Sequence, residues 1–84
     1  METFRIISVQ VVNGNSLYRT WKSNMQKVQT DKGEFIDNAP GYGPFDPKWR
    51  AAGASPGFDW KSKIGENISA VIREARGYKW INKY

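Results

Sequence analysis

The sequence contains no cysteine and no histidine, so neither disulfides nor the usual zinc sites can stabilise the fold. A chain of 84 residues buries only about two-thirds of its unfolded surface, so it needs a dense core or a partner. Its aromatic residues, four each of Trp, Tyr and Phe, can supply that core, because each buries roughly 150–250 Å². We therefore expect a single domain, residues 1–84, with most aromatic side chains inside.

The same two absences exclude several classes of protein. Iron–sulfur proteins, and hydrolases with a Ser-His-Asp or Cys-His centre, need residues that this chain lacks. The sequence also lacks a P-loop, an apolar run approaching the ~20 residues of a membrane span, and the order of regions typical of a signal peptide. We therefore expect a small soluble cytoplasmic protein without a cofactor, and a binding protein rather than an enzyme.

Three carboxylates, Asp31, Glu34 and Asp37, recur at a spacing of three residues. Such a cluster could hold a divalent metal or supply a general base. Turn formation and solubility explain the cluster more simply. We therefore predict neither a metal site nor a catalytic residue.

Charge is distributed unevenly around the net value of +5. Residues 1–30 carry a net charge of +3, residues 31–60 a net −2 and residues 61–84 a net +4. Basic ends that flank a mildly acidic middle indicate either a surface for a polyanion or a self-complementary surface for a homo-oligomer. A mixed, solvated surface is the simpler interpretation of the same values.

The N-terminal third is typical of a β-hairpin. Residues 4–12 are rich in β-branched side chains, and apolar and polar residues alternate in the second half of this segment. The dipeptide Asn13-Gly14 suits a type I′ turn, which predicts a return strand over residues 16–22. The register that follows pairs Val12 with Asn15, Val9 with Tyr18 and Ile6 with Trp21.

A second hairpin is predicted over residues 25–38. The segments 25–30 and 34–38 flank Asp31-Lys32-Gly33, and a loop with glycine in the left-handed region matches a type I turn with a G1 bulge. The two hairpins together indicate an antiparallel meander of three or four short strands.

The middle segment, residues 38–60, holds all four prolines and five aromatic residues. The aromatic residues argue against a flexible linker, because disordered segments are poor in them. Asp46 and Pro47 suit the start of a helix and Gly53 suits its end, so a short helix is predicted over residues 47–52. We expect the rest of the segment to be packed down by its own side chains.

The last third predicts a helix, because apolar residues follow a helical spacing up to Gly77. The stripe consists of Ile64, Ile68, Val71, Ile72 and Ala75. Residues 78–84 are expected to form a final strand that closes the sheet, or a docked tail. The predicted fold class is α+β: a small antiparallel β-meander of three to four strands, with a short helix near residues 47–52 and an amphipathic C-terminal helix near residues 63–76 packed on the sheet.

Basic and aromatic residues interleave in two segments, residues 18–22 and residues 76–84. Bases stack on exposed rings while Lys and Arg neutralise phosphates, so this pattern indicates binding of single-stranded RNA or DNA. The predicted nucleic-acid-binding residues are Tyr18, Arg19, Trp21, Lys22, Arg73, Arg76, Tyr78, Lys79, Trp80, Lys83 and Tyr84.

A protein-interaction module is the alternative: an inhibitor, an adaptor or an accessory subunit of a larger complex. Aromatic residues are frequent anchors of protein interfaces, and the central segment is rich in them. The anchors predicted for this case are Tyr42, Phe45, Trp49 and Phe58. Glycan binding ranks third, because neutral sugars need no positive charge. Exposure of the first set of aromatic residues would favour nucleic acid, and exposure of the second would favour a protein partner.

Overall fold

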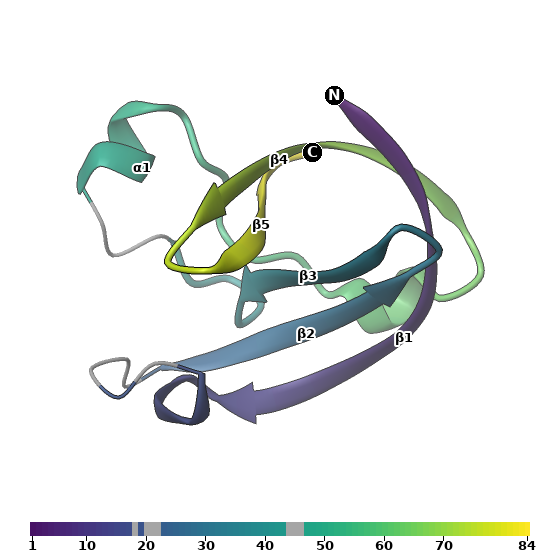
Figure 1. Cartoon of the computed structure of the whole chain (residues 1–84), viewed down its shortest axis with the longest axis horizontal. Helices are drawn as coiled ribbons and strands as arrows, with labels where there is room; N and C mark the ends of the chain where they lie inside the picture. The colour runs from purple at the N-terminus through teal and green to yellow at the C-terminus, as the bar shows by residue number, and fades with distance from the viewer. Residues whose placement is uncertain (18, 20–22, 44–46) are drawn as a thin grey trace.

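The computed structural model, which describes residues 1–17, 19, 23–43 and 47–84, is a closed β-barrel (Figure 1). The strands within these residues are β1 (Glu2–Asn13), β2 (Asn24–Thr30), β3 (Gly33–Asn38), β4 (Asn67–Ala75) and β5 (Tyr78–Lys83). They are accompanied by a short helix and two 3₁₀ turns: α1 (Pro47–Ala51), η1 (Gly14–Ser16) and η2 (Trp60–Lys63). The order around the barrel is β1-β2-β3-β5-β4, with β3 and β5 parallel and all other neighbours antiparallel.

The first strand closes the barrel because it pairs on both sides. Residues 2–5 pair with β4, and residues 6–13 pair with β2. The register shifts between Ile6 and Ser8, which marks a β-bulge, and a bulge bends a strand and increases its twist. The extra residue, Ile7, has 56% of its surface exposed. The bend allows one strand to pass from one side of the barrel to the other.

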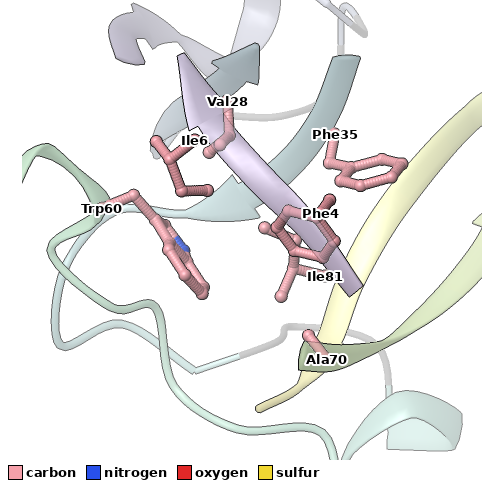
Figure 2. Close-up of a cluster of buried hydrophobic side chains, with 7 residues drawn as sticks. All are labelled: Phe4, Ile6, Val28, Phe35, Trp60, Ala70 and Ile81. Atoms are coloured by element: carbon pink, nitrogen blue, oxygen red, sulfur yellow. The ribbon is translucent and has the colours of Figure 1, made fainter. Parts of the chain in front are cut away.

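Side chains from every strand of the barrel and from η2 form the core (Figure 2). The buried cluster consists of Phe4, Ile6, Val28, Phe35, Trp60, Ala70 and Ile81. The rings of Phe4 and Phe35 meet edge to face, with their centroids 4.8 Å apart. Of the nine aromatic residues described, only Phe4, Phe35 and Trp60 are buried, so the expectation that most would lie in the core is wrong. The other six leave ring surface accessible to a ligand.

The prediction of an N-terminal hairpin turning at Asn13-Gly14 is wrong. The strand β1 runs to Asn13, and Gly14 begins η1 without the positive φ that a type I′ turn requires. The partner of β1 is β2, with Val9 opposite Val28, and Ser16, the predicted start of the return strand, is the last residue of η1. The predicted partners Tyr18 and Trp21 lie outside the described residues. Pairing with β2 outweighs the local turn preference, because it brings Val28 into the core.

The predicted α+β class is also wrong, because η2 and β4 occupy the place of the amphipathic helix expected near residues 63–76. Gly65, with φ of +91°, separates the two elements, and Ile68, Ala70 and Ile72 then point into the barrel at every second residue. The same apolar residues suit helical and strand spacing, and β-branched side chains favour the strand. The segment forms a strand because β4 pairs with both β1 and β5. This double pairing turns the expected antiparallel meander into a closed barrel.

Three local predictions are confirmed. The hairpin of β2 and β3 turns at Asp31 and Lys32, and Gly33 follows with φ of +108°. The helix α1 covers Pro47–Ala51 and is followed by Gly53 with φ of +82°, although its predicted cap Asp46 lies outside the described residues. The last segment is the strand β5.

A buried polar network closes one end of the barrel. Asp37, which is 2% exposed, accepts hydrogen bonds from Trp60 Nε1 at 2.6 Å and from the backbone N–H groups of Asn38 at 2.8 Å and Phe58 at 3.3 Å. Gln26, opposite Asp37 on β2, donates to the carbonyl oxygens of Asn38 and Phe58. Burial raises the pKa of the Asp37 carboxyl from 3.8 to about 6, although the three hydrogen bonds oppose this rise. The network ties η2 and the residues before it to the barrel.

The raised pKa of Asp37 predicts that the protein loses stability as the pH rises. The folded state holds this proton more tightly than the unfolded state, so the contribution of Asp37 is greatest below pH 4 and is lost as the pH rises through about 6. We expect a loss of about 3 kcal/mol in the free energy of unfolding between pH 4 and pH 7. Asp37→Asn should remove this dependence in urea denaturation, whereas Asp59→Asn, which removes an exposed carboxylate, should keep it. If the free energy of unfolding depended on pH equally in Asp37→Asn and in the wild type, the assignment of this dependence to Asp37 would be wrong.

The chain between β3 and η2 is fastened to itself at Gly57. Gly41 N–H donates to the carbonyl oxygen of Gly57 at 2.9 Å, and Gly57 N–H donates to that of Tyr42 at 2.8 Å. Pro40 and Gly57 form an isolated parallel bridge. These bonds hold together the two ends of the segment that carries α1.

We predict that Gly57→Ala destabilises the protein. A methyl group at this buried position would collide with the carbonyl oxygens of Asn38 and Ala39, which are backbone atoms and cannot rotate away. Such overpacking lowers the free energy of unfolding by about 1–3 kcal/mol, as measured by thermal or urea denaturation. Gly43→Ala is the matched control, because a methyl group there meets nothing within 4 Å. A Gly57→Ala protein as stable as Gly43→Ala would contradict the packing described.

Candidate nucleic-acid interface

The hairpin of β4 and β5 turns one face to the barrel interior and the other outward. Ile72 and Ile81 lie opposite each other and pack in the core. The neighbouring pair, Arg73 and Trp80, points the other way because side chains alternate along a strand, and Tyr78 shares this orientation. The outward side therefore sets a guanidinium beside two aromatic rings. We define the hairpin face as the outward-pointing Arg73, Tyr78 and Trp80 together with Arg76 and Lys79 at the end of the hairpin; Lys79, which pairs with Glu74, has the orientation of Ile81 and projects from the other side of the two strands.

Helix α1 meets the hairpin face through Trp49. Its ring contacts that of Trp80 edge to face, with centroids 5.7 Å apart and planes at 64°. The indole N–H of Trp80 donates to the carbonyl oxygen of Ala75 at 3.2 Å, which fixes the orientation of this ring. Both rings are half-buried, and the flanking Lys48 and Arg50 are exposed. Figure 1 shows α1 on the same side of the barrel as the β4–β5 turn. The helix thus adds one aromatic ring to the hairpin face, and this ring is flanked in the sequence by two exposed basic residues.

A hydrogen bond connects the hairpin face to the segment between β1 and β2. The hydroxyl of Tyr78 donates to the carbonyl oxygen of Leu17 at 2.7 Å. Arg19, which is exposed, follows Leu17 by two residues. Residues that are about 60 positions apart in the sequence are therefore neighbours on one surface.

The end of the hairpin is rich in positive charge. Arg73, Arg76 and Lys79 are exposed, and Glu74, which lies opposite Lys79, is the one carboxylate among residues 73–79. An open depression of about 370 Å³ at the turn is lined by residues 74–79. Two cations, Arg76 and Lys79, line this depression against one carboxylate, and this balance favours an anionic ligand.

Two predicted nucleic-acid-binding residues, Lys83 and Tyr84, do not join the hairpin face. The ring of Tyr84 packs against Phe58 and Trp60 at the end of the barrel, with centroid distances of 5.0 and 5.2 Å. Burial raises the pKa of the Tyr84 hydroxyl, and the nearby charge of Asp37 raises it further. Lys83 is exposed at the end of β5, next to Tyr84. Four other predicted residues, Tyr18, Trp21, Lys22 and Phe45, lie outside the described residues.

The structure describes three of the four residues predicted for a protein interface, Tyr42, Trp49 and Phe58, and two of them contact residues predicted to bind nucleic acid. Trp49 packs on Trp80, and Phe58 packs on Tyr84, so members of the two predicted sites contact each other. Tyr42 is separately exposed, at 59%. Sequence reasoning grouped Trp49 with Tyr42, Phe45 and Phe58 and did not consider its basic neighbours Lys48 and Arg50. The signal was present, because Lys48-Trp49-Arg50 interleaves basic and aromatic residues as residues 76–84 do.

The three regularly spaced carboxylates have separate structural roles. Asp31 accepts a hydrogen bond from the backbone N–H of Arg5 at 2.8 Å, and Glu34 forms an ion pair with Lys27 at 3.6 Å. Asp37 lies inside the barrel. Within the part of the chain that the structure describes, no group of three acidic residues is placed to hold a metal ion.

Comparison of the chain with family models, with curated proteins and with solved structures finds no match. Across residues 1–17, 19, 23–43 and 47–84, no helix has the length and apolar character needed to cross a membrane. The hairpin face and its chemistry are therefore the basis for inferring function.

We predict that Trp49 and Trp80 stabilise each other. In a double-mutant cycle of Trp49→Ala and Trp80→Ala, the coupling in the free energy of unfolding should be about 0.5–1.5 kcal/mol, as for other aromatic pairs. In the control cycle, Trp80→Ala with Tyr42→Ala should be additive within about 0.5 kcal/mol, because the ring of Tyr42 is exposed. Additive effects in the first cycle would show that α1 does not rest on the hairpin face.

Proposed function

We propose that the protein binds single-stranded RNA or DNA on the hairpin face, with α1 forming one side of the site. The observation that carries this proposal is the cross-strand pair of Arg73 and Trp80, next to Tyr78. The half-exposed rings would accept base faces, and the guanidinium would contact phosphates. Base stacking on an aromatic side chain is worth ~1–3 kcal/mol per base, and each neutralised phosphate releases counterions.

The half-exposed rings favour a single strand over a duplex. Bases within a duplex are stacked on one another, so their faces are not available to protein side chains. Bases of a single strand can be splayed out and stacked on Tyr or Trp. Such stacking is tolerant of sequence, because every base has a π face. We therefore propose binding with little sequence preference. We also propose that the protein acts in the cytoplasm.

The topology of the barrel is compatible with this proposal. It resembles the OB-fold, a five-stranded Greek-key barrel in which the loops after the first strand and between the last two strands border oligonucleotide sites. In this chain the corresponding segments are joined by the hydrogen bond from Tyr78 to Leu17. One fold supports many functions, so the resemblance in topology supports the proposal less strongly than the side chains do.

Binding of a labelled single strand of about 15 nucleotides, followed by fluorescence anisotropy, tests the proposal. The logarithm of the binding constant should fall linearly with the logarithm of the salt concentration, with a slope of about −0.7 per phosphate contacted. The double variant Arg73→Gln/Lys79→Gln should reduce that slope by about 1.4 if each side chain contacts one phosphate. Trp80→Leu should weaken binding by about 1–3 kcal/mol at every salt concentration, because it removes stacking and not charge.

The double variant Lys32→Gln/Lys61→Gln is the matched control, because it removes the same charge from the β2–β3 turn and from η2. It should retain the affinity and salt slope of the wild type more closely than the Arg73→Gln/Lys79→Gln protein. An equal loss in both double variants would mean that net charge alone attracts the oligonucleotide. A wild-type protein that binds no single strand at low salt would overturn the proposal and favour a protein partner.

A further inference from the structure

The turn of the β4–β5 hairpin holds a residue in an unfavourable backbone conformation. Ala75 and Tyr78 are paired, so the loop between them consists of Arg76 and Gly77. Arg76 has φ of +55° and Gly77 has φ of +81°. Positive φ at both positions of a two-residue loop defines a type I′ turn.

Arginine is a poor residue for the first position of this turn. In the left-handed region the Cβ atom approaches the following carbonyl oxygen, and only Gly, Asn and Asp adopt this conformation readily. Among the described residues, Arg76 is the one non-glycine position with positive φ, and every other such position is occupied by glycine. The chain also contains the favoured dipeptide Asn13-Gly14, but it does not use that dipeptide as a type I′ turn. No other described non-glycine residue has this strained conformation, and strained residues cluster at functional sites.

The surroundings of Arg76 indicate what its side chain recognises. Arg76 is exposed and lines the open depression at the turn together with Lys79. A planar guanidinium matches the oxygens of a phosphate group in a bidentate geometry. Glu74 in the same depression opposes an anion, and the two cations that line it, Arg76 and Lys79, outnumber it.

We propose that Arg76 is a phosphate-binding residue, held at the hairpin tip at the expense of fold stability. This inference rests on the proposed function and assigns to one residue a direct contact with the nucleic-acid backbone. Fold stability and phosphate binding oppose each other at this position, because a residue better suited to the turn would lack the guanidinium.

The test compares Arg76→Asn, which creates a favoured type I′ dipeptide, with Arg76→Lys, which retains both the charge and the strain. Arg76→Asn should raise the midpoint of urea denaturation, weaken binding of the single-stranded oligonucleotide by about tenfold, and reduce the salt slope by about 0.7. Arg76→Lys should match the stability and salt slope of the wild type, with intermediate affinity. Lys32→Asn removes one charge from the β2–β3 turn, which lies on the opposite side of the barrel in Figure 1, and should leave binding unchanged.

The outcomes separate this inference from the proposed function. If Arg76→Asn binds as the wild type does while Trp80→Leu and Arg73→Gln/Lys79→Gln bind weakly, the inference is wrong and the proposed function stands. If Arg76→Asn is less stable than the wild type, Arg76 has a structural role and the trade-off is wrong. If the wild type binds no single strand, both proposals fail.

Discussion

The bulge in β1 is the feature on which the rest of the structure depends. A strand that bends between Ile6 and Ser8 can pair with β4 along one half and with β2 along the other. This double pairing closes the sheet, so the strands share one interior that Phe4, Ile6 and Val28 fill. Closure also leaves few backbone groups unpaired at a sheet edge, which limits edge-to-edge association. The outer faces of the strands, together with the connecting segments, thereby become the surface available to a ligand, and our proposal uses those of β4 and β5.

Two positions show where this fold accepts an unfavourable arrangement. Asp37 is buried, and its three hydrogen bonds only partly offset the loss of hydration that raises its pKa. The carboxylate accepts hydrogen bonds from Trp60 and from the backbone N–H of Phe58, and these bonds attach η2 to the end of the barrel. Arg76 has an unfavourable backbone conformation, and its side chain is exposed at the tip of a turn. The first arrangement is explained by structure, and our proposal assigns the second to phosphate binding.

The candidate site could be predicted from sequence only where its residues are close in the chain. The interleaving of Tyr78, Lys79 and Trp80 pointed to the hairpin face, and Arg73 was included because it lies opposite the predicted apolar stripe. That reason was wrong, since Arg73 reaches the site as the strand partner of Trp80. Trp49 was assigned to the predicted protein interface because its contact with Trp80 joins segments about 30 residues apart, and no local pattern encodes such a contact.

The sequence by itself determined the short-range features: the β2–β3 hairpin through Gly33, the helix α1 between Pro47 and Gly53, and the extended character of residues 78–83. These follow from backbone preferences that act over a few residues. Tertiary structure decided the partner of β1 and the conformation of residues 67–75, because their apolar spacing suits both a helix and a strand. Only strand pairing and a shared core distinguish those alternatives, since both depend on residues far apart in the chain.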